Sequence, residues 1–127
     1  MENKDIDKLI AEKVMGWERI EGEKAISEFE NQPQKNDWFH RKCIWIKDGQ
    51  RMACEECGTL PQYTDSISDA WQVVEKMIEK GFDFGIDYDE GWIADFGLPP
   101  DYKQGGQADE NTAPLAICKA ALKSCEL

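Results

Sequence analysis

The feature that most constrains this 127-residue chain is a set of four potential metal ligands with the spacing H-x2-C-x10-C-x2-C. They are His40, Cys43, Cys54 and Cys57. Two ligand pairs, each with two residues between its members, are what a tetrahedral zinc site built from two knuckles requires. Four protein ligands leave no open position for water or substrate. The spacing therefore predicts one structural Zn2+ rather than a catalytic metal.

The residues between the two ligand pairs favour a β-hairpin. Asp48 and Gly49 form a reversal signal between two apolar runs at residues 44–46 and 51–53. Such a turn would bring the two ligand pairs together. The sequence thus predicts a zinc-binding hairpin over residues 38–58.

Two alternatives to zinc remain open. In the first, the cysteines are ordinary buried thiols and the histidine lies at the surface. In the second, Cys43 and Cys54 form a disulfide across the hairpin. The chain has five cysteines, an odd number that fits a reducing compartment better than a secreted disulfide scaffold. The N-terminus lacks a secretory apolar region and no apolar run approaches the length of a membrane span, so we expect a cytoplasmic protein.

The net charge of the chain limits the kinds of partner that it is expected to bind. Acidic residues outnumber basic ones by 26 to 15, which gives a net charge of −11. Such a surface repels nucleic acid and anionic membrane, because phosphate contacts supply most non-specific affinity. A basic protein is a better electrostatic match. At this length we expect one domain over residues 1–127.

Apolar spacing predicts three helices outside the hairpin. The first covers the start of the chain and ends at Gly16. The second begins after a capping-box signature at Ser66 and Asp69, and the third begins near Thr112. The second helix is expected to bury one continuous apolar face, made of Ile67, Ala70, Trp71, Val74, Met77 and Ile78.

A second hairpin follows the middle helix. Residues 82–88 alternate apolar and acidic side chains, and residues 92–96 return as the partner strand. Residues 98–107, rich in glycine and proline, are expected to form an exposed loop. Hairpins alternating with helices predict an α+β fold with an antiparallel β-sheet flanked by helices.

Three stretches resemble the phage ABA-sandwich family. They read LIAEKVMGW at residues 9–17, LPQYTDSISDAWQVVEK at residues 60–76 and DENTAPLAICKAALK at residues 109–123. The resemblance implies a small phage or prophage protein built as an α-β-α sandwich, to which the zinc hairpin is an addition. These motifs are core-packing signatures and name no chemistry. Small acidic zinc-bearing phage proteins also resemble some anti-CRISPR inhibitors of Cas9.

Catalysis has little support in this sequence, and we expect no enzyme. No Gly-rich phosphate loop follows a strand, and the single histidine is assigned to zinc. Acidic residues cluster at Asp83, Asp87, Asp89 and Glu90, with a spacing that does not match an EF-hand loop. This cluster is either a solvated strand face or an acidic strip that faces a basic partner.

Our first hypothesis is a non-enzymatic phage counter-defence protein that binds a host protein, specifically the type II effector Cas9. Cas9 holds its guide–target heteroduplex in a positively charged channel, which an acidic protein would block against DNA. Candidate contacts are the acidic strip and a second acidic run. That run comprises Glu21, Glu23, Glu28 and Glu30.

Two other functions remain alternatives. The first is a homo-oligomeric sponge that sequesters a cyclic-nucleotide immune signal, which requires pockets lined by arginine or lysine. The second is a structural or regulatory phage protein with no role in defence. Light scattering and thermal shift against cyclic nucleotides separate the sponge from the other two.

Removal of one zinc ligand by Cys57→Ser should act through folding. Structural zinc contributes on the order of 10 kcal/mol of apparent binding free energy, comparable to the whole stability of a typical domain. We expect the variant to lose zinc and to unfold over residues 38–58, while the helices at 66–80 and 112–125 persist. Elemental analysis and far-UV circular dichroism test this. Wild-type protein carrying well under one zinc per chain contradicts the assignment.

Overall fold

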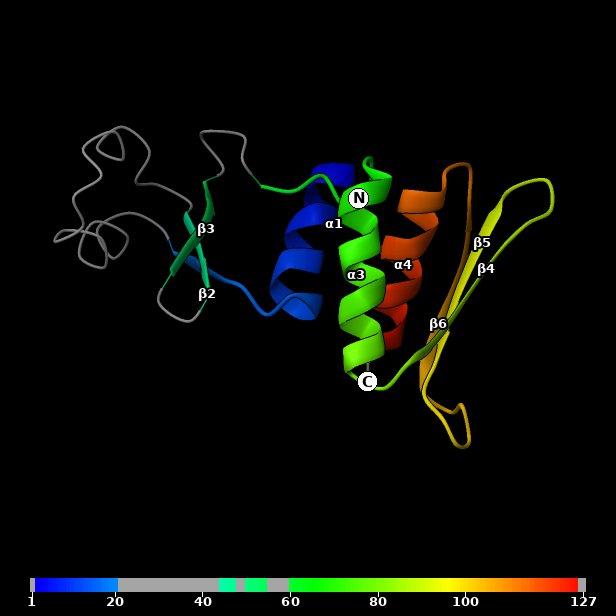
Figure 1. Ribbon diagram of the computed structural model, residues 1–127. Helices are drawn as coiled ribbons and strands as arrows, with labels where there is room; N and C mark the ends of the chain where they lie inside the picture. Colours follow the sequence, from blue (N-terminus) through cyan, green and yellow to red (C-terminus); the bar gives the residue numbers. More distant parts are fainter. Residues whose placement is uncertain (1, 21–43, 48–49, 55–59, 126–127) are drawn as a thin grey trace, which may run out of the picture. The chain divides into compact units, whose positions relative to one another are not determined.

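The structure is a computed structural model that describes residues 2–20, 44–47, 50–54 and 60–125 (Figure 1). The chain forms two compact units. Unit 1 comprises residues 1–15 and 62–127, and unit 2 comprises residues 16–61. Among the described residues, no helix is long and apolar enough to cross a membrane.

Unit 2 contains a three-stranded antiparallel sheet in the order β1-β2-β3. Its strands are β1 (Glu18–Ile20), β2 (Ile44–Lys47) and β3 (Gln50–Cys54). Ile44 lies opposite Cys54 and Lys47 lies opposite Gln50. The predicted pairing of residues 44–46 with 51–53 is therefore confirmed, with a shift of register between Trp45 and Ile46. The turn residues 48–49 lie outside the described part of the chain.

Unit 1 holds the helices that the apolar spacing predicts. They are α1 (Asn3–Leu9), which continues as the π-helical η1 (Ile10–Val14), then α3 (Ile67–Glu79) and α4 (Ala113–Cys125). The capping signature is confirmed, because the Asp69 amide donates to the Ser66 hydroxyl. Gly16, with φ of 75°, follows the first helix.

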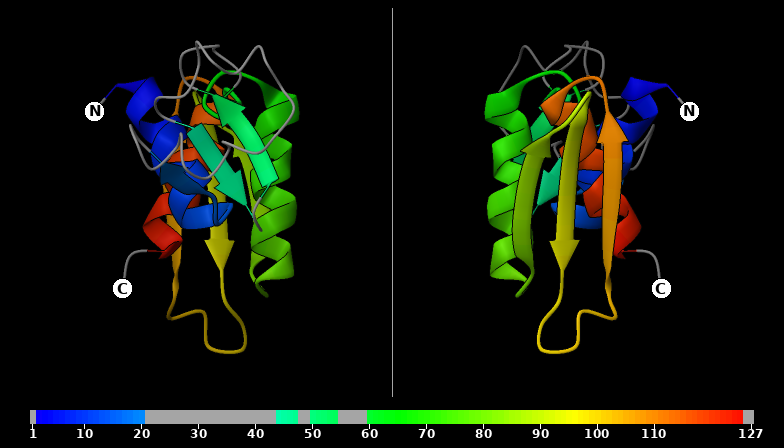
Figure 2. Two further views of the ribbon diagram at one scale, coloured as in Figure 1. Left: turned by 90° about the vertical axis from the view of Figure 1, so that its left-hand side faces the viewer. Right: turned by 90° about the vertical axis from the view of Figure 1, so that its right-hand side faces the viewer.

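A second antiparallel sheet belongs to unit 1. It contains β4 (Asp83–Tyr88), β5 (Trp92–Gly97) and β6 (Gly105–Glu110) in sequence order. Both β5 and β6 contact α4, and α4 in turn contacts α1 and η1 (Figures 1 and 2). The predicted α+β class with antiparallel sheets is confirmed. The layer order of unit 1 differs from a sheet with helices on both faces, because its described helices all lie on one face of β4–β5–β6.

Strand β6 lies where the sequence predicts an exposed loop, so that prediction is wrong for residues 105–107. The strand reads GGQADE, with none of the β-branched or aromatic residues typical of strands. Its glycines are required by close packing instead. A Cβ on Gly105 would clash with the Phe96 carbonyl oxygen, and one on Gly106 would lie 2.7 Å from the Ala120 carbonyl oxygen. Side-chain spacing carries no signal for such a strand.

The apolar face of α3 is only partly buried, contrary to prediction. Ala70, Val73, Val74 and Met77 are fully buried, whereas Ile67, Trp71 and Ile78 are about half exposed. Periodicity predicts which residues share one side of a helix but not how much of that side a neighbour covers. Trp71 makes an edge-to-face contact with Phe84 of the sheet, at 6.0 Å between ring centroids.

A buried carboxylate ties α1 to the turn before α3. The Thr64 amide donates to Asp7 Oδ1 at 2.9 Å, and both residues are buried. Burial raises the pKa of Asp7, and the hydrogen bonds from Thr64 oppose that rise. The contact joins segments 57 residues apart in sequence.

We expect Gly106→Ala to destabilise unit 1, because the new methyl group meets the Ala120 carbonyl and the Ser124 amide of α4 at under 3 Å. Overpacking of this kind costs about 1–3 kcal/mol. Gly85→Ala is the matched control, since nothing lies within 4 Å of a Cβ there. Urea denaturation measures both free energies of unfolding. Equal stability of the two variants would show that β6 does not pack against α4 this closely.

Candidate protein-binding face

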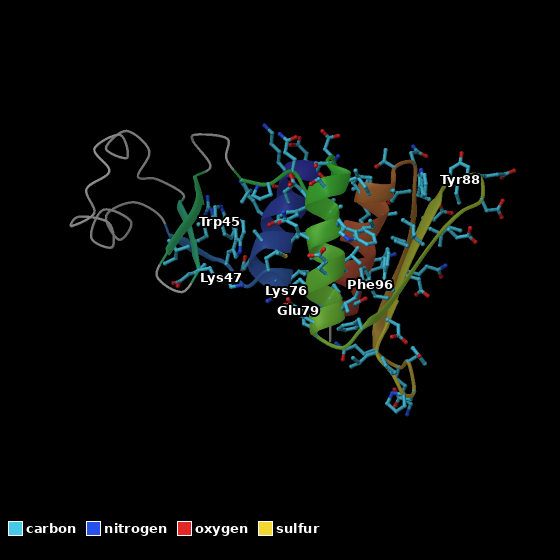
Figure 3. The ribbon with its side chains drawn as sticks, in the orientation of Figure 1. Trp45, Lys47, Lys76, Glu79, Tyr88 and Phe96 are labelled. Atoms are coloured by element: carbon cyan, nitrogen blue, oxygen red, sulfur yellow. The ribbon has the colours of Figure 1, made fainter. Side chains whose placement is uncertain are left out.

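The two faces of the β4–β5–β6 sheet differ in chemistry. The inner face carries Phe84, Ala94, Phe96 and Ala108, and Phe96 points toward the helices (Figure 3). The rings of Phe84 and Phe96 lie 5.0 Å apart between centroids, tilted by 37°. Alternation of side chains along each strand directs the residues between them to the opposite face. The right-hand view of Figure 2 looks onto this outer face.

The outer face carries four aspartates, which we call the acidic face. They are Asp83 and Asp87 on β4, Asp95 on β5 and Asp109 on β6, all exposed. In the register of the sheet, Gly97 lies opposite Asp83, and Ile93 lies opposite both Asp87 and Asp109. Asp95 is therefore the diagonal neighbour of all three other aspartates, at roughly 7–8 Å. Asp95 is the centre of the cluster.

Tyr102 lies across one end of the acidic face. Its hydroxyl donates to Asp83 Oδ2 at 2.7 Å. Its ring lies over Gly97, where an added Cβ would meet Tyr102 Cδ1 at 2.7 Å. The Asp83 carboxylate, as hydrogen-bond acceptor and as a nearby charge, raises the pKa of the Tyr102 phenol. Tyr102 was not among the residues predicted from the sequence, because it lies in the loop between β5 and β6.

Three lysines of unit 1 make contacts away from the aspartates of the acidic face. Lys119 pairs with Glu110 at 2.6 Å, Lys76 pairs with Glu79 at 3.3 Å, and Lys123 donates to the Gln107 carbonyl oxygen. Among the ion pairs between described residues, none includes an aspartate of the acidic face. This face therefore presents uncompensated negative charge to a partner.

The predicted acidic residues have different outcomes. Asp83 and Asp87 lie on the acidic face, and Asp89 and Glu90 form the exposed β4–β5 turn, where Glu90 has φ of 59°. The second acidic run lies outside the described residues and comprises Glu21, Glu23, Glu28 and Glu30. The structure adds Asp95 and Asp109, which neighbouring strands bring beside the predicted pair. Asp95 was visible in the alternation of β5, whereas Asp109 required knowledge of β6.

The predicted zinc ligands fall mostly outside the described part of the chain. His40, Cys43 and Cys57 are not described, and of Cys54 only the backbone is. Cys54 ends β3 and lies opposite Ile44, the first residue of β2. In this register the start of β2 lies beside the end of β3. Each of these strand ends adjoins one of the two ligand pairs, and a two-knuckle site requires the two pairs to be close. Within the described ranges, no group of three His, Cys, Asp or Glu is arranged to hold a metal, and the zinc site stays a prediction.

The remaining cysteines of unit 1 are packing residues. Cys118 is fully buried in α4, and burial raises the pKa of its thiol. Cys125 is partly buried at the end of the same helix. A thiol held in its neutral form is a poor nucleophile and a poor metal ligand, so Cys118 contributes to the core.

We expect Asp83→Asn to lower the pKa of Tyr102 toward its ordinary value. The substitution removes the charge that disfavours the phenolate and weakens the hydrogen bond to the phenol. A pH titration followed by NMR of the Tyr102 ring carbon measures this. Asp95→Asn is the control and should leave Tyr102 nearly unchanged. Equal effects of the two variants would contradict the contact with Asp83.

Comparison with known proteins agrees with this architecture. The model of the phage ABA sandwich domain matches residues 8–122. A crystal structure of a phage protein from Bacillus cereus ATCC 14579 is similar, with 31% sequence identity and a TM-score of 0.61. The match covers 98% of this chain and 92% of that protein. The comparison with curated proteins found no match. The chain belongs to the phage ABA sandwich domain family.

Proposed function

We propose that this phage-family protein is a non-enzymatic binding protein whose acidic face docks on a basic surface of a host protein. The observation that carries the proposal is the cluster of four exposed aspartates with Asp95 at its centre, without a basic neighbour among the ion pairs of the described residues. Charge complementarity of this kind steers association and selects the partner. The net charge of −11 acts in the same direction over longer distances.

Cas9 remains our specific candidate for the partner. Its positively charged channel offers the complementary surface, and a phage benefits from blocking it. The support for this choice is the charge of the chain and its phage family, and a direct cleavage assay decides it. Full DNA cleavage by Cas9 in the presence of excess protein would exclude this partner while leaving other basic partners to be found by pull-down from host lysate.

A nucleotide sponge receives less support from the structure. A shallow groove of about 540 Å³ runs along α3, lined by Ile67, Ser68, Trp71, Gln72 and Glu75. Its lining includes a carboxylate and no basic residue, which disfavours an anionic nucleotide. We therefore place binding of a basic protein before capture of a nucleotide.

The zinc hairpin is proposed as the stabilising element of unit 2. Thiolates and imidazole are the ligands that zinc prefers, and His40, Cys43, Cys54 and Cys57 supply a complete tetrahedral set. Bound zinc would contribute folding free energy to this small three-stranded sheet. The acidic face lies on unit 1, so binding through it does not require zinc chemistry.

Reversal of charge at the centre of the acidic face should weaken binding. We expect Asp87→Lys with Asp95→Lys to slow association with the partner by on the order of tenfold at low salt, with a smaller difference at high salt. The matched control is Glu12→Lys with Asp65→Lys, which changes net charge equally at exposed sites of unit 1 outside this face. Surface plasmon resonance measures the association rates. Equal rates for the two double variants would show that net charge, not this face, governs binding.

A further inference from the structure

Helix α3 leaves one apolar side without cover in unit 1. Ile67, Trp71 and Ile78 are 55%, 48% and 53% exposed, whereas Ala70, Val73, Val74 and Met77 of the same helix are fully buried. Spacings of four and seven residues place these three on the same side of the helix. The groove along α3 includes Ile67 and Trp71. Large apolar side chains gathered in this way mark a contact surface more often than scattered single ones do.

Strand β4 is an open edge of the sheet, next to that side of α3. It pairs with β5 and with no other strand of the described residues. At the turn, the Asp89 amide donates to the Gly91 carbonyl oxygen at 2.9 Å. Counting back from Asp89, every second residue of β4 therefore directs its backbone N–H and C=O groups toward β5. The residues between them, Phe84 and Ile86, direct their backbone N–H and C=O groups to the open edge.

The edge and the helix side form one surface. The right-hand view of Figure 2 shows α3 extending past the edge of β4, and the ring contact of Trp71 with Phe84 joins the two elements. Neighbouring strands lie about 4.8 Å apart. A fourth strand beside β4 would therefore cover the exposed side of α3. On the inner side of β4, Ile86 and Tyr88 are also exposed, because the hairpin leans away from the helices toward its turn (Figure 1).

Charge decides which strand fits this edge. A second copy of β4, paired antiparallel with Phe84 opposite Ile86, would place Asp83 opposite Asp87 twice, and like charges directly opposite destabilise a sheet. In this register the aspartates disfavour pairing of the edge with a second copy. A strand with lysine or arginine on the outer face would instead pair with them.

We propose that the open edge of β4 and the exposed side of α3 bind an extended segment of a partner protein as a fourth strand. The segment alternates basic residues, which face Asp83 and Asp87, with apolar residues, which cover Trp71 and Ile86. Backbone hydrogen bonds to Phe84 and Ile86 supply affinity, and the alternating side chains supply specificity. This inference rests on the proposed function and assigns the contact by which the acidic face engages its basic partner.

A synthetic peptide tests the proposal on the full-length protein. The probe is a ten-residue peptide of alternating lysine and valine, with two N-methylated forms, one methylated at the valines and one at the lysines. In antiparallel pairing, only the valine amides point toward β4. We expect N-methylation at the valines to weaken binding roughly tenfold in fluorescence anisotropy, since two backbone hydrogen bonds are lost. Methylation at the lysines should change it little, and the reverse pattern would assign a parallel strand.

Variants of the protein separate this proposal from the proposed function. We expect Trp71→Ala to weaken peptide binding severalfold, and Asp87→Lys with Asp95→Lys to weaken it further. If both N-methylated peptides bind alike while the charge reversal still abolishes binding, strand addition is wrong and the acidic face remains a docking site. Failure of the unmethylated peptide to bind also overturns strand addition. If charge reversal does not affect capture of the basic partner, the proposed function itself fails.

Discussion

Helix α4 is the element on which the rest of unit 1 depends. It contacts β5 and β6 on one side, α3 beside it, and α1 with η1 on the other. Its fully buried positions are mostly small, comprising Ala116, Ile117, Cys118, Ala120, Ala121 and Ser124. Small side chains let neighbours approach the backbone closely, and Gly106 does so at the Ala120 carbonyl. Ser124 satisfies its hydroxyl within the helix by donating to that same carbonyl.

This central helix also explains the asymmetry of the sheet. Because α4 and α3 cover only one face, alternation along each strand separates apolar residues from charged ones. The outer face then carries aspartates that no packing constraint holds in place, and their chemistry is available for recognition. Tyr102 and the glycine beneath it give that face one ordered polar contact at its end.

The elements that could be predicted from the sequence are those with a periodic apolar pattern or a capping signal. The helices at Ile67–Glu79 and Ala113–Cys125, the β4–β5 hairpin and the β2–β3 pairing all carry apolar spacing or capping signals. Strand β6 carries neither signal, because its glycines are required by close contacts with α4 and β5 that exist only in the folded chain. Asp109 was missed because it lies on β6, and Asp95, although visible in the alternation of β5, becomes the centre of the acidic face only through the cross-strand register. The zinc ligands remain a prediction.

The division of unit 1 around residues 16–61 has a consequence for how the chain folds. The first helix buries Ile6, Ile10 and Val14 in a unit centred on α4, which follows every other element of that unit in the sequence. During synthesis, the apolar side of α1 and η1 therefore stays unpacked until α4 has been synthesised. Closure of so long an intervening segment costs little more than closure of a shorter one. Unit 2, which lies between the two segments of unit 1 in the sequence, can accordingly change in length at little cost in loop-closure free energy.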